Sequence, residues 1–252
     1  EWDSWYAPRA LYRLLDAGLR ARVVPDETSL ATEAGPVEPG RGAIVVPVAG
    51  QALSPSDIHD LMVRAAREDS VTVHAASTGL TARGSDLGGF ALSDVEKPEV
   101  LLVTGREIVS NDAGELWHLL DHHMHMAVSM IDLSELGSAS LDRYTHILMP
   151  HGRYGSLDEA FREKLDRWVR AGGVLVATRS AARWVAEHDL SSAEYLGADD
   201  GEADSDEAAT VSASTQQAQA PVETEAATEP PEPAPAEEIE TNAEEDTGDV
   251  DA

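Results

Sequence analysis

Residues 98–105, Pro98-Glu99-Val100-Leu101-Leu102-Val103-Thr104-Gly105, decide the fold class of this chain. Their apolar run is not interrupted by polar residues, which is typical of a strand in a parallel sheet that is covered on both faces. Further strands are expected at Val128–Ile131, His146–Met149 and Val174–Ala177. Helical patterns separate these strands. The alternation predicts a doubly wound parallel sheet of the α/β class.

Two amphipathic helices are expected between these strands. The first has Ala113, Leu116 and Leu120 on one face. The second begins near Ser156, because Ser156 and Glu159 have the spacing of a capping box. Both helices would cover faces of the sheet. Residues 98–196 are therefore predicted to form one α/β domain.

The first 78 residues show a similar alternation. One helix is expected from Pro8 and another after Ser54, whose hydroxyl suits a helix N-cap. Strands are expected at Arg22–Val24, Ala43–Val48 and Val71–Ala75. Residues 26–42 are rich in Gly, Pro, Glu and Thr and are predicted to be a loop. Residues 79–97 are expected to connect this half to the next.

The two halves also match each other at near-constant spacing. Leu11–Asp16 matches Leu116–Asp121 at an offset of 105 residues, and later matches have an offset of 103. Chance agreement of apolar positions is the alternative, but the shared order of elements favours duplication. We expect two flavodoxin-like halves related by duplication. The first copy lacks a counterpart of the strand at 100–104, so a strand is expected upstream of Glu1.

Charge is distributed unevenly along the chain. The formal net charge is −29, and residues 199–252 hold 18 of the 47 acidic residues and no basic residue. A polyanionic surface repels nucleic acid and anionic lipid, so neither is expected as a partner. Residues 197–252 also lack aromatic side chains and cannot bury enough apolar area to offset the entropy cost of folding. This segment is predicted to be a disordered acidic tail.

The residue types present exclude several kinds of site. The chain has no cysteine, so disulfides, thiolate metal sites and a cysteine nucleophile are excluded. No apolar run reaches the ~20 residues that a membrane span requires. The stretch Gly84–Gly89 lacks the spacing and the lysine of a phosphate-binding loop.

A histidine cluster is the first candidate for a metal site. His118 and His122 are four residues apart on one expected helix face, a spacing that can bind a metal. That face lies opposite the apolar one and should be solvated. No glutamate has the spacing of a zinc-binding helix, so no metal site is assigned here.

The strand ends near Gly105 and His151 are the second candidate. A doubly wound sheet binds ligands at the carboxyl ends of its strands. His151 and Arg153 lie just after the strand 146–149, and Gly105 follows the strand 100–104. Ser156 is better explained as a helix cap than as a nucleophile. Gly105, His151 and Arg153 are therefore the candidates for a small-anion or ligand site, with no catalytic residue and no metal, but an ordinary exposed turn is the favoured interpretation of this stretch.

Several motifs of the second half resemble the glutamine amidotransferase class I-like domain that is appended to large bacterial zinc carboxypeptidase-like proteins. The stretches that carry this resemblance are Pro98–Gly105, Ser110–Asp121, Leu141–Tyr144, Trp168–Gly173 and Ala181–Trp184, with Ser77–Thr81 and Gly84–Gly88 upstream. In that family, catalysis belongs to a separate N-terminal domain, where two His and one Glu hold zinc and a further Glu is the general base. This chain contains no His-x-x-Glu sequence, so no zinc ligand is carried over.

The resemblance implies a non-catalytic accessory region of a zinc metallocarboxypeptidase-like protein. Its partner would be the N-terminal peptidase domain of the same polypeptide. Zinc would be bound by that peptidase domain, and this chain would bind no cofactor. The protein would be exported to the periplasm or the extracellular space. The rival hypothesis is a small-ligand or carbohydrate-binding α/β module that uses the strand ends near Gly105 and His151. A weak hydrolase that uses Ser or His ranks third.

Overall fold

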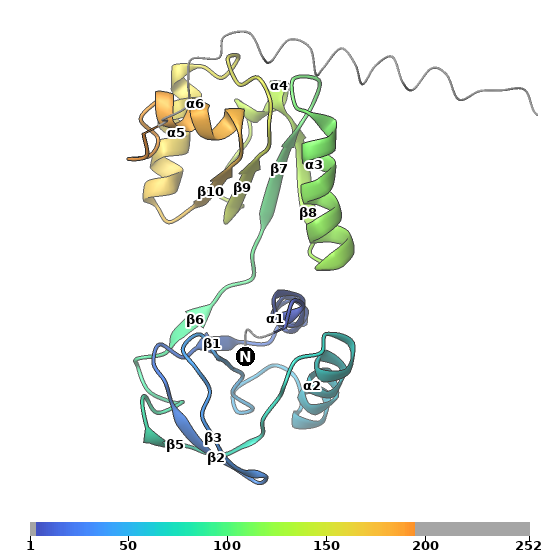
Figure 1. Ribbon diagram of the computed structural model, residues 1–252, viewed down its shortest axis with the longest axis vertical. Coiled ribbons are helices and arrows are strands. Elements are labelled where there is room, and N and C mark those ends of the chain that lie inside the picture. The colour runs from blue at the N-terminus through green and yellow to red at the C-terminus, as the bar shows by residue number, and fades with distance from the viewer. Residues whose placement is uncertain (1–3, 195–252) are drawn as a thin grey trace, which may run out of the picture. The chain divides into compact units, whose positions relative to one another are not determined.

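The computed structural model describes residues 4–194 of the chain (Figure 1). Helices and strands alternate through this part, and the α/β class is confirmed. The predicted acidic tail, residues 197–252, lies outside the described residues, so its disorder stays a prediction. Among residues 4–194, no helix combines the length and the apolar character that crossing a membrane requires.

A four-stranded parallel sheet organises residues 98–194. Its strands are β7 (Val100–Thr104), β8 (Val128–Asp132), β9 (His146–Met149) and β10 (Val174–Ala177), in the order β10-β9-β7-β8. All three neighbouring pairs are parallel. The chain leaves β7 for β8 on one side and returns to β9 on the other side. The strand order therefore reverses at β7, which is the place where such sheets bind ligands.

The two faces of this sheet have separate cores, because successive side chains of a strand point to opposite faces. One core contains Leu101, Val103, Ile147, Met149, Phe161, Leu165, Trp168, Ala181 and Trp184. Its helices are α5 (Glu159–Arg170) and α6 (Ser180–Glu187). The other core contains Val100, Leu102, Leu148, Leu116 and Leu120. Its helices are α3 (Ser110–Trp117) and the π-helix η1 (His118–His123). Each fully buried large apolar side chain stabilises the fold by about 1.5–3 kcal/mol.

The start of α5 differs from the prediction. Asp158 is the N-cap, and its Oδ1 accepts a hydrogen bond of 2.8 Å from the backbone N–H of Phe161. The predicted capping box of Ser156 and Glu159 is therefore wrong. A carboxylate at the N-cap also interacts favourably with the helix dipole. Ser156 is exposed and lies before the helix.

The first part of the chain contains two antiparallel sheets. One has the order β4-β1-β6, from β4 (Ile44–Val45), β1 (Ala21–Val23) and β6 (Ser93–Val95). The other has the order β3-β2-β5, from β3 (Gly35–Val37), β2 (Ser29–Thr32) and β5 (Ala76–Arg83). A parallel sheet is therefore confirmed for the second half alone. Two flavodoxin-like halves are not confirmed.

Local chemistry explains these differences. The expected loop 26–42 contains a hairpin, in which Thr32 pairs with Gly35 and Gly35 has φ +116°, a conformation that favours glycine. The strand expected at 71–75 is absent, and β5 begins at Ala76 instead. Most residues of β5 are exposed, so they lack the apolar pattern from which buried strands are predicted.

Two helices complete the first part. They are α1 (Ala7–Asp16) and α2 (Pro55–Glu68). Leu14, Leu19 and Ile58 are buried together between them. The predicted cap at Ser54 is confirmed, because its hydroxyl accepts a hydrogen bond of 3.2 Å from the backbone N–H of Asp57.

Candidate functional site

The three predicted site residues lie at the carboxyl end of the parallel sheet. β7 and β9 are in register with Leu102 beside Leu148, so Gly105 and His151 follow their strands at equivalent positions. An antiparallel bridge joins Ile108 to Gly152 and ties the loop after β7 to the loop after β9. Within the second loop, the buried Tyr154 hydroxyl donates a hydrogen bond of 2.7 Å to the carbonyl of Pro150. These loops therefore have fixed positions.

Gly105 lies against a carboxylate. Its φ is +120°, and a Cβ at this position would lie 2.8 Å from Oδ2 of Asp132, at the end of β8. Asp132 accepts hydrogen bonds from the hydroxyl (2.6 Å) and backbone N–H (2.9 Å) of Ser134. These two bonds, the hydroxyl's first, hold the pKa of the Asp132 carboxyl below its ordinary value. The strand end at Gly105 is therefore close to a negative charge, which disfavours an anion there.

His151 contacts a residue that the sequence reasoning missed. Its Nδ1 lies 2.5 Å from Oγ of Ser180, the first residue of α6. The same hydroxyl oxygen accepts a bond of 2.9 Å from the N–H of Gly152 and lies 2.7 Å from the carbonyl of Gly152. Arg153 has an exposed side chain, and its backbone N–H donates to the carbonyl of Glu107 at 2.9 Å. The structure thus brings His151 to Ser180, and the Arg153 side chain forms no hydrogen bond or ion pair with either residue.

The turn between β10 and α6 has a strained geometry. Arg179 occupies it with φ 52° and ψ −121°, a combination that L-residues rarely adopt. A strained strand-to-helix turn at the carboxyl end of a parallel strand is the geometry of a nucleophile elbow. Here the elbow position holds an arginine, whose guanidinium lies 3.6 Å from the carboxylate of Asp112. The two-residue connection between Ala177 and Ser180 was the sequence signal for this turn.

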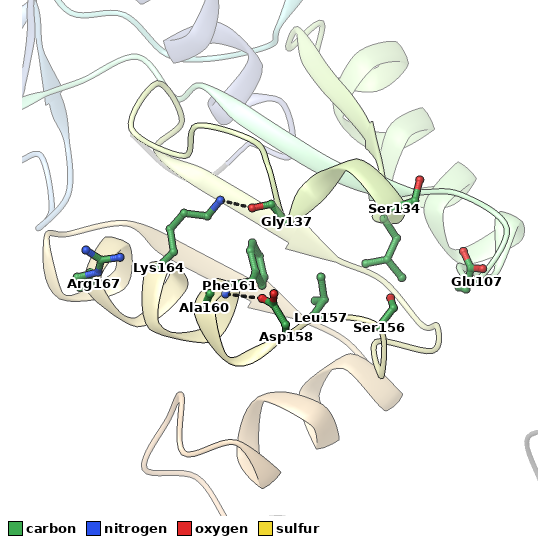
Figure 2. A pocket seen from close by; sticks show the side chains of 11 residues that line it. Glu107, Ser134, Gly137, Ser156, Leu157, Asp158, Ala160, Phe161, Lys164 and Arg167 are labelled. Carbon is green, nitrogen blue, oxygen red and sulfur yellow. Dashed lines mark hydrogen bonds between the residues drawn. The ribbon is translucent and has the colours of Figure 1, made fainter.

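A cavity of about 540 Å³ lies on the α5 side of the sheet (Figure 2). Its lining comes from the loop after β7, from α4 (Leu133–Leu136), from the segment before α5 and from α5 itself. Ser156 belongs to this lining, so the residue expected to cap the helix faces a hollow instead. The Lys164 ammonium donates to the carbonyls of Gly137 (2.6 Å) and Ala139 (2.8 Å).

The histidine cluster forms a group of adjacent rings. The ring centroids of His118 and His122 are 4.8 Å apart, as are those of His118 and His123. The rings of His118 and His122 are stacked. In residues 4–194, no group of three or more His, Cys, Asp or Glu side chains could hold a metal ion.

Comparison of the chain with protein-family models, with curated proteins and with solved structures found no match in any of the three.

Proposed function

We propose that this chain is a non-catalytic α/β module with an amidotransferase-like second half. The observation that carries the proposal is Arg179 at the elbow position. Acyl-transfer enzymes with this geometry place Ser or Cys there, so that the nucleophile stands exposed above the sheet. A guanidinium stays protonated in proteins and cannot act as a nucleophile. The elbow geometry is present, but its chemistry is absent.

The neighbouring hydroxyl does not replace that nucleophile. Ser180 is the residue after the elbow, and its oxygen contacts the imidazole of His151 and both backbone groups of Gly152. These contacts fasten α6 to the loop after β9. A structural role accounts for these three contacts of the Ser180 hydroxyl.

The parent protein that we propose is a zinc metallocarboxypeptidase-like protein, of which this chain would be the accessory region. The resemblance to that family supports this proposal. The motifs that carry the resemblance lie where they stabilise the fold. Gly172, with φ +109°, ends α5, and a Cβ on Gly173 would clash with the indole of Trp168. The zinc ion and the general base would lie in the N-terminal peptidase domain of the whole protein, and that domain would be the partner of this chain. The whole protein would be exported.

Two measurements test the non-catalytic proposal. The purified chain should not accelerate the hydrolysis of glutamine, of a peptide with a free C-terminus or of a p-nitrophenyl ester above the rate in buffer alone. Because the chain has no cysteine, Arg179→Cys and Arg162→Cys each introduce a single thiol. The thiol of Arg179→Cys should react faster with iodoacetamide at neutral pH, because the N-terminus of α6 lowers a thiol pKa. If the chain hydrolyses the ester and Ser180→Ala abolishes that activity, the non-catalytic proposal is overturned. If the thiols of Arg179→Cys and Arg162→Cys react at equal rates, position 179 is not a nucleophile elbow.

The second candidate function is a small-ligand or carbohydrate-binding module. The cavity beside α5 favours it, because its volume falls within the range of about 300–1,000 Å³ that ligand sites occupy. A thermal-shift screen separates the two candidates. Reproducible stabilisation by one class of ligand supports the binding module, and no response to any class supports a purely structural accessory region.

A further inference from the structure

Two cations in the lining of the cavity have no anionic partner in the described part of the chain. Lys164 and Arg167 are three residues apart, so they share a face of α5. Neither forms an ion pair with a residue in 4–194, although Arg170, further along the helix, pairs with Asp166 at 2.7 Å. Neither charge is neutralised within this part of the chain, so both can attract an anionic group of a ligand.

A carboxylate without a partner lies at the other end of the lining. Figure 2 shows Glu107 far from Lys164 and Arg167, with Leu157 and Phe161 between them. Glu107 is half-buried, and its side chain forms no hydrogen bond or ion pair with residues 4–194. Its backbone is held in place, because its carbonyl accepts a bond of 2.9 Å from the N–H of Arg153. The cavity thus offers positive charge at one end and negative charge at the other.

Apolar side chains and one further carboxylate lie between these ends. The carboxylate is that of Asp158, whose Oδ1 accepts the hydrogen bond from the backbone N–H of Phe161 that caps α5. Leu133 and Phe161 are each 2% exposed, and Leu157 is 6% exposed. Ser134 and Ser156 add hydroxyl groups to the lining. The lining therefore mixes apolar and polar groups, and a small number of fixed polar groups is what orients a ligand in a small-molecule site.

We propose that this cavity binds a short peptide with free termini and an apolar side chain. Its carboxylate would meet Lys164 and Arg167, its ammonium group would meet Glu107, and its side chain would lie over the exposed Ala160. A single amino acid fits less well, because it carries both charges on one carbon, whereas Glu107 lies at the opposite end of the lining from Lys164 and Arg167. The proposal deepens the second candidate function and rests on it.

The lining favours this ligand energetically as well as geometrically. The ammonium of Lys164 is already fixed by the carbonyls of Gly137 and Ala139, so little entropy is lost when it meets a carboxylate. The guanidinium of Arg167 presents a planar pair of donors that suits carboxylate oxygens. Its Nε donates to the carbonyl of Glu163, which orients the group along the helix.

Isothermal titration calorimetry of the full chain with leucyl-leucine tests the proposal. Three forms of the dipeptide are compared: free at both ends, N-acetylated and C-amidated. The free form should bind with a Kd of about 1 mM or tighter, and blocking either end should weaken binding about tenfold. Free leucine should bind more weakly than the dipeptide. Equal heats from all three dipeptide forms, or no saturable heat, would overturn the proposal.

Variants show which residue of the cavity binds each end of the dipeptide. In Glu107→Gln the free and N-acetylated dipeptides should bind alike, and in Arg167→Gln the difference between the free and amidated forms should shrink. Arg162→Gln is the matched control, because Arg162 is on the same helix and outside the lining. An effect of Arg162→Gln as large as that of Arg167→Gln refutes the assignment. If a sugar stabilises the chain and no dipeptide binds, this inference fails and the binding function stands; if no ligand class stabilises it, both fail.

Discussion

Nδ1 of His151 lies 2.5 Å from the hydroxyl oxygen of Ser180, and this contact joins the loop after β9 to the first turn of α6. The two residues are 29 positions apart in the sequence and follow the carboxyl ends of the neighbouring strands β9 and β10. The pair resembles half of a catalytic arrangement. The Ser180 hydroxyl, however, also contacts both backbone groups of Gly152, so its role is to hold α6 against the loop after β9.

Replacing Ser180 with Ala should therefore lower stability. The change removes the acceptor of the Gly152 N–H and leaves the imidazole of His151 without this contact, and an unmade hydrogen bond of this kind costs about 1–3 kcal/mol. Urea denaturation followed by circular dichroism measures the change in free energy of unfolding. Ser156→Ala is the control, because Ser156 is exposed and has no side-chain hydrogen bond in the described part of the chain. If Ser180→Ala lowers the free energy of unfolding no more than the control does, the structural role of Ser180 is contradicted.

Gly105→Ala should also destabilise the second half. The positive φ of Gly105 strains any L-residue, and the added methyl group would press on the carboxylate of Asp132. Backbone strain of this type costs about 1–3 kcal/mol. Gly155→Ala provides a comparison, since nothing lies within 4 Å of a Cβ there. Equal thermal midpoints for the two variants would show that the backbone at Gly105 adapts without strain.

The parallel sheet could be predicted because its strands carry their signal in the sequence. Val100 to Val103 form an apolar run, and the runs at 146–149 and 174–177 recur between helical patterns. Burial on both faces makes such a signal strong. The first part lacks this signal, because β5 is mostly exposed and β4 contains two residues. Antiparallel partners, and not local pattern, determine these strands.

The sequence located the candidate residues at strand ends but did not predict their surroundings, and none of them lines the cavity beside α5. The rule that ligand sites lie at the carboxyl ends of strands located Gly105 and His151. Arg179 was missed, because arginine has no preference for its strained torsions and only the surrounding fold enforces them. The cap of α5 was also misassigned, since Ser156 and Asp158 are both good cap residues and the backbone path selects between them.

The buried carboxylate of Asp69 should be essential for the contact between α1 and α2. Its Oδ1 lies 2.6 Å from Nε of Arg9 and 3.2 Å from a terminal nitrogen of Arg13, and the side chain is fully buried. Asp69→Ala would leave two guanidinium groups without this anion, and breaking a buried pair in this way costs about 3–5 kcal/mol. Chemical denaturation measures the loss. Asp16→Asn, at the exposed pair with Lys97, should change stability far less. Similar losses in both variants would contradict the assignment.

The stability of the chain should depend on the protonation of His146. Burial lowers the pKa of His146 below its ordinary value of 6.5, and its Nδ1 lies 2.8 Å from the hydroxyl of Thr145. The unfolded chain therefore takes up a proton more readily than the folded chain. As the pH falls through 6.5, the free energy of unfolding should decrease, and the decrease should level off below the folded pKa.

His146→Gln isolates this contribution from that of the other histidines. Urea denaturation at pH values of about 7.5 and about 5.5 brackets the ordinary histidine pKa. The native chain should lose more stability between these two values than the variant, because the variant has no group that titrates at position 146. His125→Gln, a substitution at an exposed histidine, provides the comparison variant. If the native chain and His146→Gln lose equal stability, burial of His146 does not couple folding to pH.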